Sequence, residues 1–137
     1  MSPEDAPRHQ QRERALSLLY EAELKGEAPS EVVAALPVAP DAFVRTLLLQ
    51  AEATREEADR RIAAASSSWP LERMAVIDRI VLRLAVAELL DPDGPPTAVV
   101  IDEAVELAKA YSTDESGGFV NGILSAIATD LRPPPRA

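Results

Sequence analysis

The stretch VIDRIVLRLAVAELL, from Val76 to Leu90, decides the fold of this chain. Its polar side chains are Asp78, Arg79, Arg83 and Glu88, and apolar residues cover every side of a helical wheel. A helix that is apolar nearly all round is buried by neighbours on several sides. The run is also shorter than the ~20 residues that span a bilayer. We therefore predict the central helix of a helical bundle, with one narrow edge at Asp78, Arg79 and Arg83 reaching solvent or a partner.

The composition favours one all-α domain. A chain of 137 residues can bury a real core. Hydrophobic residues make up 47% of it but aromatic residues only 4%, so the core consists mainly of Leu, Ile, Val and Ala, which favours helices over sheets. We expect a single helical domain over residues 8–131, a disordered tail over 1–7 and a flexible, proline-rich tail over 132–137.

Several classes of site are excluded by the same composition. The chain has no cysteine, so it forms no disulfide and uses no thiolate. His9 is its only histidine, which excludes an ordinary zinc site, and we expect no metal or cofactor. No signal or membrane-spanning segment stands out, so a cytoplasmic protein without membrane contact is expected. The net charge of −9 disfavours broad, charge-driven binding of nucleic acid but leaves room for a local basic patch.

Apolar spacing predicts further helices on both sides of the central one. Asp41 is a suitable N-cap for the third of them, and Gly26 and the prolines of the loop DPDGPP are stop signals. The predicted segments are Arg8 to about Gly26, Ser30 to Leu36, Ala42 to about Ala65, a short turn at Trp69 and Pro70, Thr97 to Ser112, and Phe119 to Leu131.

The first helix begins with an unusual number of arginines, at positions 8, 12 and 14. Cations are unfavourable at a helix N-terminus, so Arg8, Arg12 and Arg14 indicate either a solvated helix start or a site for an anionic ligand. Trp69 is interpreted as a packing residue in preference to a base-stacking platform. Gly122, inside the last helix, predicts the close approach of another backbone or a ligand.

Four segments, taken in order, resemble the NusB family, bacterial factors of transcription antitermination and ribosomal RNA synthesis. They are RERALSLLYEAEL (Arg12–Leu24), DRIVLRLAVAEL (Asp78–Leu89), IDEAVELAKAY (Ile101–Tyr111) and SGGFVNGIL (Ser116–Leu124). The resemblance implies an all-α fold of about seven helices in two packed sub-bundles around the central helix, and no enzymatic activity.

The resemblance also implies partners and site residues. Family members bind single-stranded boxA RNA together with the small-subunit ribosomal protein NusE, within an antitermination complex on RNA polymerase. The protein-partner surface maps onto Asp78 and Arg79. Phe119 fits a core position as well as a base-stacking one. The RNA-binding roles map onto Arg8, Arg12, Arg14, Tyr111, Phe119 and Asn121.

Two alternatives remain open at this point. Gly118 stands where the family commonly has lysine, and Asp102 where it has asparagine, so the chain could be a NusB-like paralogue that acts as a protein-interaction module with weak or no RNA binding. It could also resemble the NusB-like N-terminal domain of a ribosomal RNA cytosine methyltransferase, with any catalysis in another chain. The resemblance is compatible with a homodimer.

Overall fold

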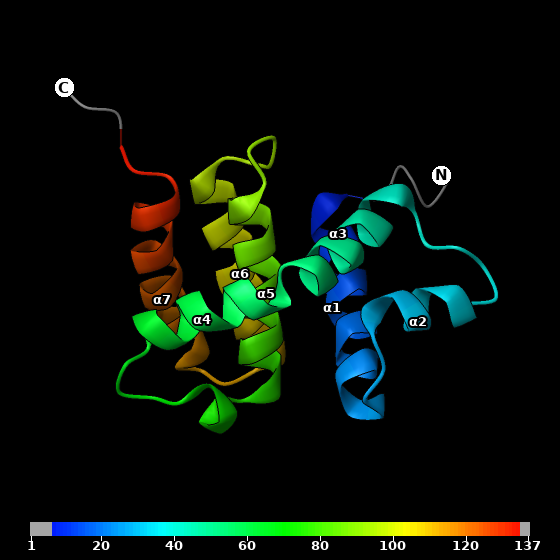
Figure 1. Ribbon diagram of the computed structural model, residues 1–137, viewed down its shortest axis with the longest axis horizontal. Helices are drawn as coiled ribbons and strands as arrows, with labels where there is room; N and C mark the ends of the chain where they lie inside the picture. The colour runs from blue at the N-terminus through cyan, green and yellow to red at the C-terminus, as the bar shows by residue number, and fades with distance from the viewer. Residues whose placement is uncertain (1–6, 135–137) are drawn as a thin grey trace.

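The computed structural model describes residues 7–134, so residues 1–6 of the predicted N-terminal tail (1–7) and residues 135–137 of the predicted C-terminal tail (132–137) lie outside the described residues. Within that range the chain forms seven α-helices and one 3-10 turn, and no strand, which confirms the all-α prediction (Figure 1). The elements are α1 (Arg8–Lys25), α2 (Pro29–Ala35), α3 (Ala42–Ala53), α4 (Arg55–Ala65), η2 (Leu71–Arg73), α5 (Val76–Leu90), α6 (Thr97–Tyr111) and α7 (Ser116–Leu131).

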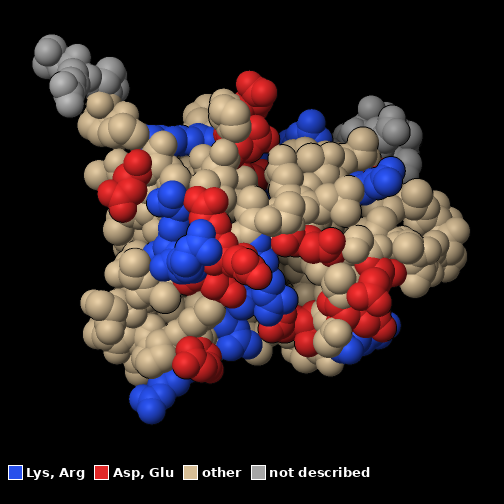
Figure 2. Space-filling view, viewed as in Figure 1, with Lys and Arg blue, Asp and Glu red and all other residues tan. Residues whose placement is uncertain are grey.

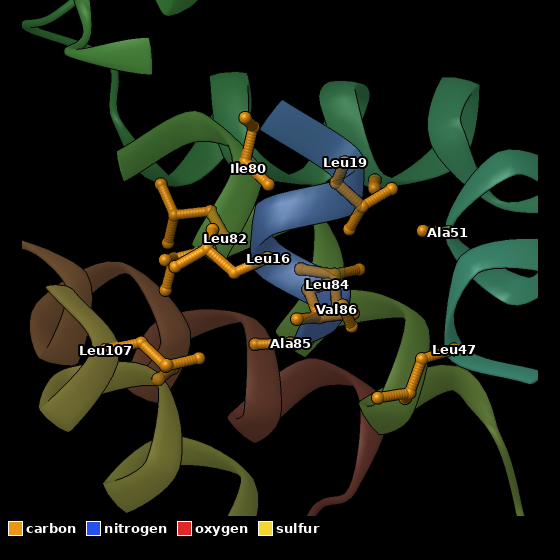
Figure 3. Close-up of a cluster of buried hydrophobic side chains, with 14 of the residues drawn as sticks. Leu16, Leu19, Leu47, Ala51, Ile80, Leu82, Leu84, Ala85, Val86 and Leu107 are labelled. Carbon is orange, nitrogen blue, oxygen red and sulfur yellow. The ribbon is translucent and has the colours of Figure 1, made fainter. Parts of the chain in front are cut away.

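The helices form two sub-bundles that share α5. Helices α1, α2 and α3 pack on one another on one side, and α4, α6 and α7 lie on the other (Figure 1). Helix α5 contacts α1 and α3 as well as α4, α6 and α7. In Figure 3, side chains of α1, α3 and α6, labelled Leu16, Leu47 and Leu107, gather around those of α5. Every residue of α5 from Ile80 to Leu89 is buried, which confirms the predicted central helix.

The edge of α5 that we expected to be open is largely covered. Asp78 is 7% exposed and Arg83 is 9% exposed. Two hydrogen bonds, of 2.7 and 3.2 Å, join the Arg83 guanidinium to Asp59 of α4, and Glu23 of α1 lies 3.6 Å from it. The prediction of an exposed edge was wrong for these two positions, because carboxylates of both sub-bundles close over Arg83. Arg79 is half-buried.

The predicted long helix over residues 42–65 is two helices. Helix α3 ends at Ala53 and α4 begins at Arg55, with Thr54 between them at φ −103° and ψ 5°. The Thr54 hydroxyl donates to the Gln50 carbonyl at 2.7 Å, which satisfies a backbone acceptor at the end of α3. Because the chain turns at this point, α4 packs against α5 and α7. The predicted cap is confirmed: the Asp41 carboxylate accepts from the backbone N–H of Val44 at 2.9 Å.

Arg132, which we assigned to a flexible tail, is held in place. Its guanidinium donates to four backbone carbonyls at the end of α5 and in the loop that follows: those of Glu88, Leu89, Asp91 and Pro95, at 3.0, 3.1, 3.1 and 2.6 Å. The C-terminal carbonyls of a helix have no partner inside the helix, so an arginine from α7's end satisfies them. The domain therefore extends past Leu131.

Among the residues described, none of the helices combines the length and the apolar character that a membrane crossing requires.

Candidate nucleic-acid interface

At the start of α1, the guanidinium of Arg8 lies over an aromatic ring. The Arg8 guanidinium carbon lies 4.0 Å from the centre of the Phe43 ring at the start of α3. Its Nη1 donates to the side-chain oxygen of Gln11 at 2.6 Å. Arg8 is exposed and has no carboxylate within ion-pair distance among residues 7–134. The side chain is thus oriented while its charge stays available, as expected for a contact with phosphate.

Arg12, one turn later, points into the protein. It is 3% exposed, and its Nη2 lies 2.9 Å from the carboxylate of Glu88 in α5. Burial raises the pKa of Glu88 more than the hydrogen bond from Arg12 lowers it. The expectation that Arg12 contacts RNA phosphates does not fit this position, because its guanidinium is desolvated and already paired. The sequence signal for a buried pair was Glu88, a carboxylate in the apolar run at the C-terminal end of α5, but the sequence does not show which arginine it meets.

Arg14 is exposed, and it makes no hydrogen bond or ion pair with the other described residues. Arg14 lies six positions after Arg8, which places the two side chains roughly 120° apart around the helix. The predicted cluster of three arginines is therefore one buried residue and two surface residues on different faces.

Tyr111 lies beside α1, at the end of α6. Its hydroxyl donates a hydrogen bond to the carboxylate of Glu13, and this bond raises the pKa of Tyr111. Nearby, His9 lies 2.9 Å from the carboxylate of Glu103, and this hydrogen bond raises the pKa of His9. The structure places Tyr111 beside the first helix, next to Glu13, and brings His9 and Glu103 together nearby. Sequence reasoning missed these contacts because they join residues of distant segments.

Phe119 and Asn121, at the start of α7, face different surroundings. Phe119 is half-buried and packs against the core, whereas Asn121 is exposed and makes no hydrogen bond with the other described residues. Two positions apart on a helix, the two side chains point in directions roughly 160° apart. Of the two alternatives predicted at Gly122, the close approach of a backbone was wrong, because no heavy atom of the described structure lies within 4 Å of the position that a Cβ would occupy there. The approach of a ligand stays a prediction.

A shallow groove of about 410 Å³ lies between η2, the start of α5 and the start of α7. Trp69 is 46% exposed on it, so the interpretation of this residue as a packing residue was wrong. Asp78 lies among the lining residues; one of its oxygens accepts from the hydroxyl of Ser116 at 3.0 Å, and the other, Oδ1, has no partner. The Nε of Arg79 is likewise buried without a partner. The groove is lined by Trp69, Arg73, Met74, Ala75, Asp78, Thr113, Glu115, Ser116 and Phe119.

Charges of both signs are interspersed on the face that includes α4. Figure 2 shows basic and acidic side chains side by side over this helix, where Arg61 pairs with Glu57 at 2.9 Å and Asp59 pairs with Arg83 at 2.7 Å. Each of these cations is neutralised by a neighbouring carboxylate. This face therefore offers no continuous basic surface to a nucleic acid.

Comparison of the sequence finds close relatives. A profile of the NusB family matches residues 9–129. The transcription antitermination protein NusB of Saccharopolyspora erythraea is 43% identical over 127 residues, which cover 88% of this chain and 86% of the relative. The protein of the same name from Sorangium cellulosum is 43% identical over 126 residues, which cover 88% of this chain and 90% of the relative.

Solved structures share the fold. A structure of T. maritima NusB superposes with a TM-score of 0.82 at 35% identity, covering 91% of this chain and 92% of the other. A crystal structure of the antitermination factors NusB and NusE in complex with dsRNA superposes with a TM-score of 0.75 at 32% identity, covering 90% of this chain and 96% of the matched chain. The likeness extends over nearly all of the described residues.

Proposed function

Because this chain belongs to the NusB family, we propose that it is a non-catalytic adaptor of transcription antitermination and ribosomal RNA synthesis. It binds boxA-type single-stranded RNA together with the ribosomal protein NusE, in the cytoplasm, within the antitermination complex on RNA polymerase. The observation that carries the proposal is the likeness, over 90% of this chain, to NusB in a complex with NusE and RNA.

The RNA-binding part of the proposal rests on the α1 surface. Arg8 and Arg14 supply exposed cations at this helix start, and the half-exposed ring of Tyr111 lies next to Glu13 on the same helix. Single-stranded RNA is bound by cations along its backbone and by aromatic faces against its bases. Asn121 provides a free amide for a base edge. In this proposal Arg12 positions α1 and does not touch RNA.

The protein-binding part rests on the groove between η2, α5 and α7. Its aromatic walls, Trp69 and Phe119, offer apolar contact area, and NusE docks there. At its floor the free Oδ1 of Asp78 is a buried acceptor that lacks a donor. A buried polar group without a hydrogen bond costs about 1–3 kcal/mol, and a donor from a docked partner removes that cost.

A fluorescence-anisotropy titration tests the proposal. Labelled boxA-like RNA and a scrambled RNA are titrated with the protein, with and without NusE, at two salt concentrations. We expect boxA-selective binding that NusE strengthens and that salt weakens, because phosphate contacts release counterions. Equal affinity for both RNAs in every condition would contradict the RNA-binding part.

A second candidate, a paralogue that acts only as a protein-interaction module, is favoured by one observation. Of the three arginines at the start of α1, Arg12 is buried in an ion pair with Glu88. The whole chain carries a net charge of −9. This candidate predicts NusE binding without selective RNA binding in the same titration. Tight RNA binding that Arg8→Ala abolishes would eliminate it.

A further inference from the structure

We propose that the RNA site extends onto α3: the shallow pocket between the starts of α1 and α3 receives an RNA phosphodiester, and Phe43 is the positioning residue that holds Arg8 for this contact. The inference rests on the proposed RNA-binding function and adds a subsite and a residue to it. The pocket has a volume of about 430 Å³ and is lined by Arg8, Gln11, Asp41, Ala42, Phe43 and Thr46.

Arg8 is oriented by groups that carry no charge. The Phe43 ring lies under its guanidinium at 4.0 Å, and the neutral amide of Gln11 accepts from Nη1 at 2.6 Å. Its Nε and Nη2 have no hydrogen-bond partner among residues 7–134. By contrast, Arg12 and Arg83 are oriented by carboxylates, which neutralise them. Within the part of the chain that the structure describes, Arg8 is therefore fixed in direction, has no carboxylate partner and keeps two nitrogens free to donate, which is what a phosphate requires.

The Phe43 ring is held in place by Arg12 and by the hydrophobic core. The Arg12 guanidinium carbon lies 5.2 Å from the centre of the same ring, and Arg12 is anchored by Glu88 at 2.9 Å. Phe43 also packs against the hydrophobic core. Because the ring cannot move freely, it defines where Arg8 lies. The buried ion pair thus supports the surface arginine through one aromatic ring.

The negative charge in the pocket, that of Asp41, already accepts a backbone hydrogen bond. Asp41 is the only carboxylate among the lining residues, and its Oδ1 accepts from the Val44 N–H at 2.9 Å as the cap of α3. An anion bound to Arg8 therefore meets one carboxylate that is partly compensated by a helix N-terminus. Gln11, the hydrogen-bond partner of Arg8 on α1, is neutral and adds no negative charge to the pocket.

The energetic role of Phe43 is preorganisation. A free arginine side chain loses rotamer freedom when it binds a phosphate, and a side chain that is already ordered loses less. An exposed cation–π contact of this kind is worth about a two- to fivefold change in affinity. This is the part of the RNA affinity that we assign to Phe43.

A double-mutant cycle in RNA affinity tests the inference. The variants are Arg8→Ala, Phe43→Leu and the double variant, titrated as full chains with boxA-like RNA in the presence of NusE. We expect Arg8→Ala to weaken binding about tenfold, since a charge-assisted hydrogen bond is lost. Phe43→Leu should weaken it about two- to fivefold in the wild-type background and by less than about 1.5-fold once Arg8 is gone.

Further readouts separate positioning from loss of structure. Arg8→Ala should lower the salt slope of binding by about 0.7, one phosphate contact to a single strand, whereas Phe43→Leu should leave that slope unchanged because no charge is removed. Phe43→Tyr keeps the aromatic face and should retain wild-type affinity. Leu49→Ala, an exposed apolar truncation on the same helix, should do so too. Thermal unfolding and NusE affinity are recorded for every variant.

Two results would overturn the inference in different ways. If the wild-type chain binds boxA-like RNA but Phe43→Leu weakens binding equally with and without Arg8, Phe43 acts only through the fold, and the subsite is refuted while the proposed function stands. If the wild-type chain with NusE does not bind the RNA selectively, the proposed function and this inference fail together.

Discussion

Each end of α5 buries a carboxylate, and the two carboxylates differ in how completely they are hydrogen-bonded. Glu88, near the C-terminal end, is 4% exposed and fully paired with Arg12 of α1. Asp78, near the N-terminal end, is 7% exposed, has one hydrogen bond from Ser116 and leaves its Oδ1 without a partner. Burying a charge is costly unless it is paired and hydrogen-bonded. The complete pair joins α1 to the central helix, whereas the carboxylate of Asp78, with one oxygen unpaired, lines a groove that we assign to a partner.

The largest expected effect comes from breaking the complete pair. Arg12→Ala leaves Glu88 buried without its cation, and removal of one partner of a buried pair costs about 3–5 kcal/mol. We therefore expect the free energy of unfolding, measured by urea titration, to fall by about that amount. The double variant Arg12→Met, Glu88→Leu is the matched control, because it removes both charges and should recover most of the loss. A loss below about 1 kcal/mol in the single variant would show that the pair is not buried in solution.

A smaller effect is expected from Arg132, which holds the same end of α5 without a carboxylate. Arg132→Ala removes the hydrogen bonds to the carbonyls of Glu88, Leu89, Asp91 and Pro95. Each lost bond to a charged donor contributes on the order of 1 kcal/mol, but Arg132 is only half-buried, so water replaces part of these bonds and the expected loss is about 2 kcal/mol. Urea titration measures it, with Arg14→Ala as the control for removal of an exposed arginine. An unchanged midpoint would mean that the end of the chain is loose, as the sequence alone suggested.

At the other end of α5, Asp78→Asn should separate stability from binding. The amide can keep the hydrogen bond to Ser116, so we expect the free energy of unfolding to change by less than about 1 kcal/mol. The affinity for NusE should fall about tenfold, because a neutral amide replaces the buried carboxylate whose unpaired Oδ1 would accept a hydrogen bond from NusE. Titration calorimetry with NusE measures this change. Asp102→Asn removes an exposed carboxylate on α6 and should leave the affinity as it is. If both variants bind NusE equally well, the groove is not the docking site.

The smallest effect is expected where the acid and base are exposed. His9 has a pKa raised above 6.5 by its hydrogen bond to Glu103, with smaller contributions from Glu13 and Glu106. A raised folded-state pKa gives stability that is fully present below the unfolded value and lost as pH rises through the folded value. The Tm difference between wild type and His9→Gln should thus be larger at about pH 5.5 than at about pH 8. The same comparison in Glu103→Gln should show little pH dependence, and a persistent one would assign the effect to other groups.

Several features of the fold could be predicted from local sequence patterns. The central helix was evident from its apolar residues, the cap from Asp41, and the end of α1 from Gly26, which has φ 66°. These signals act over one or two turns of helix, so neighbouring residues suffice to reveal them. The four motifs also placed the chain in its family, which the sequence comparisons confirm.

The break between α3 and α4 at Thr54 could not be predicted from the sequence. The apolar spacing of residues 42–65 continues across it, so the pattern predicts one helix. The bend at Thr54 places α4 against α5 and α7. Tertiary packing overrides local propensity in this way whenever a bend buries more surface than a straight helix.

The sequence by itself determined most of the helices, the buried centre and the family, and the tertiary structure decided the break between α3 and α4 and the partner of each charged residue. Arg8 and Arg12 are indistinguishable as a pair four residues apart, yet one lies on Phe43 at the surface and the other pairs with a carboxylate 76 positions away. Asp78 and Glu88 are likewise equivalent as acids within an apolar run. Helical periodicity is a local property, but pairing and desolvation depend on which distant segments fold against each face, and those are set only when the bundle closes.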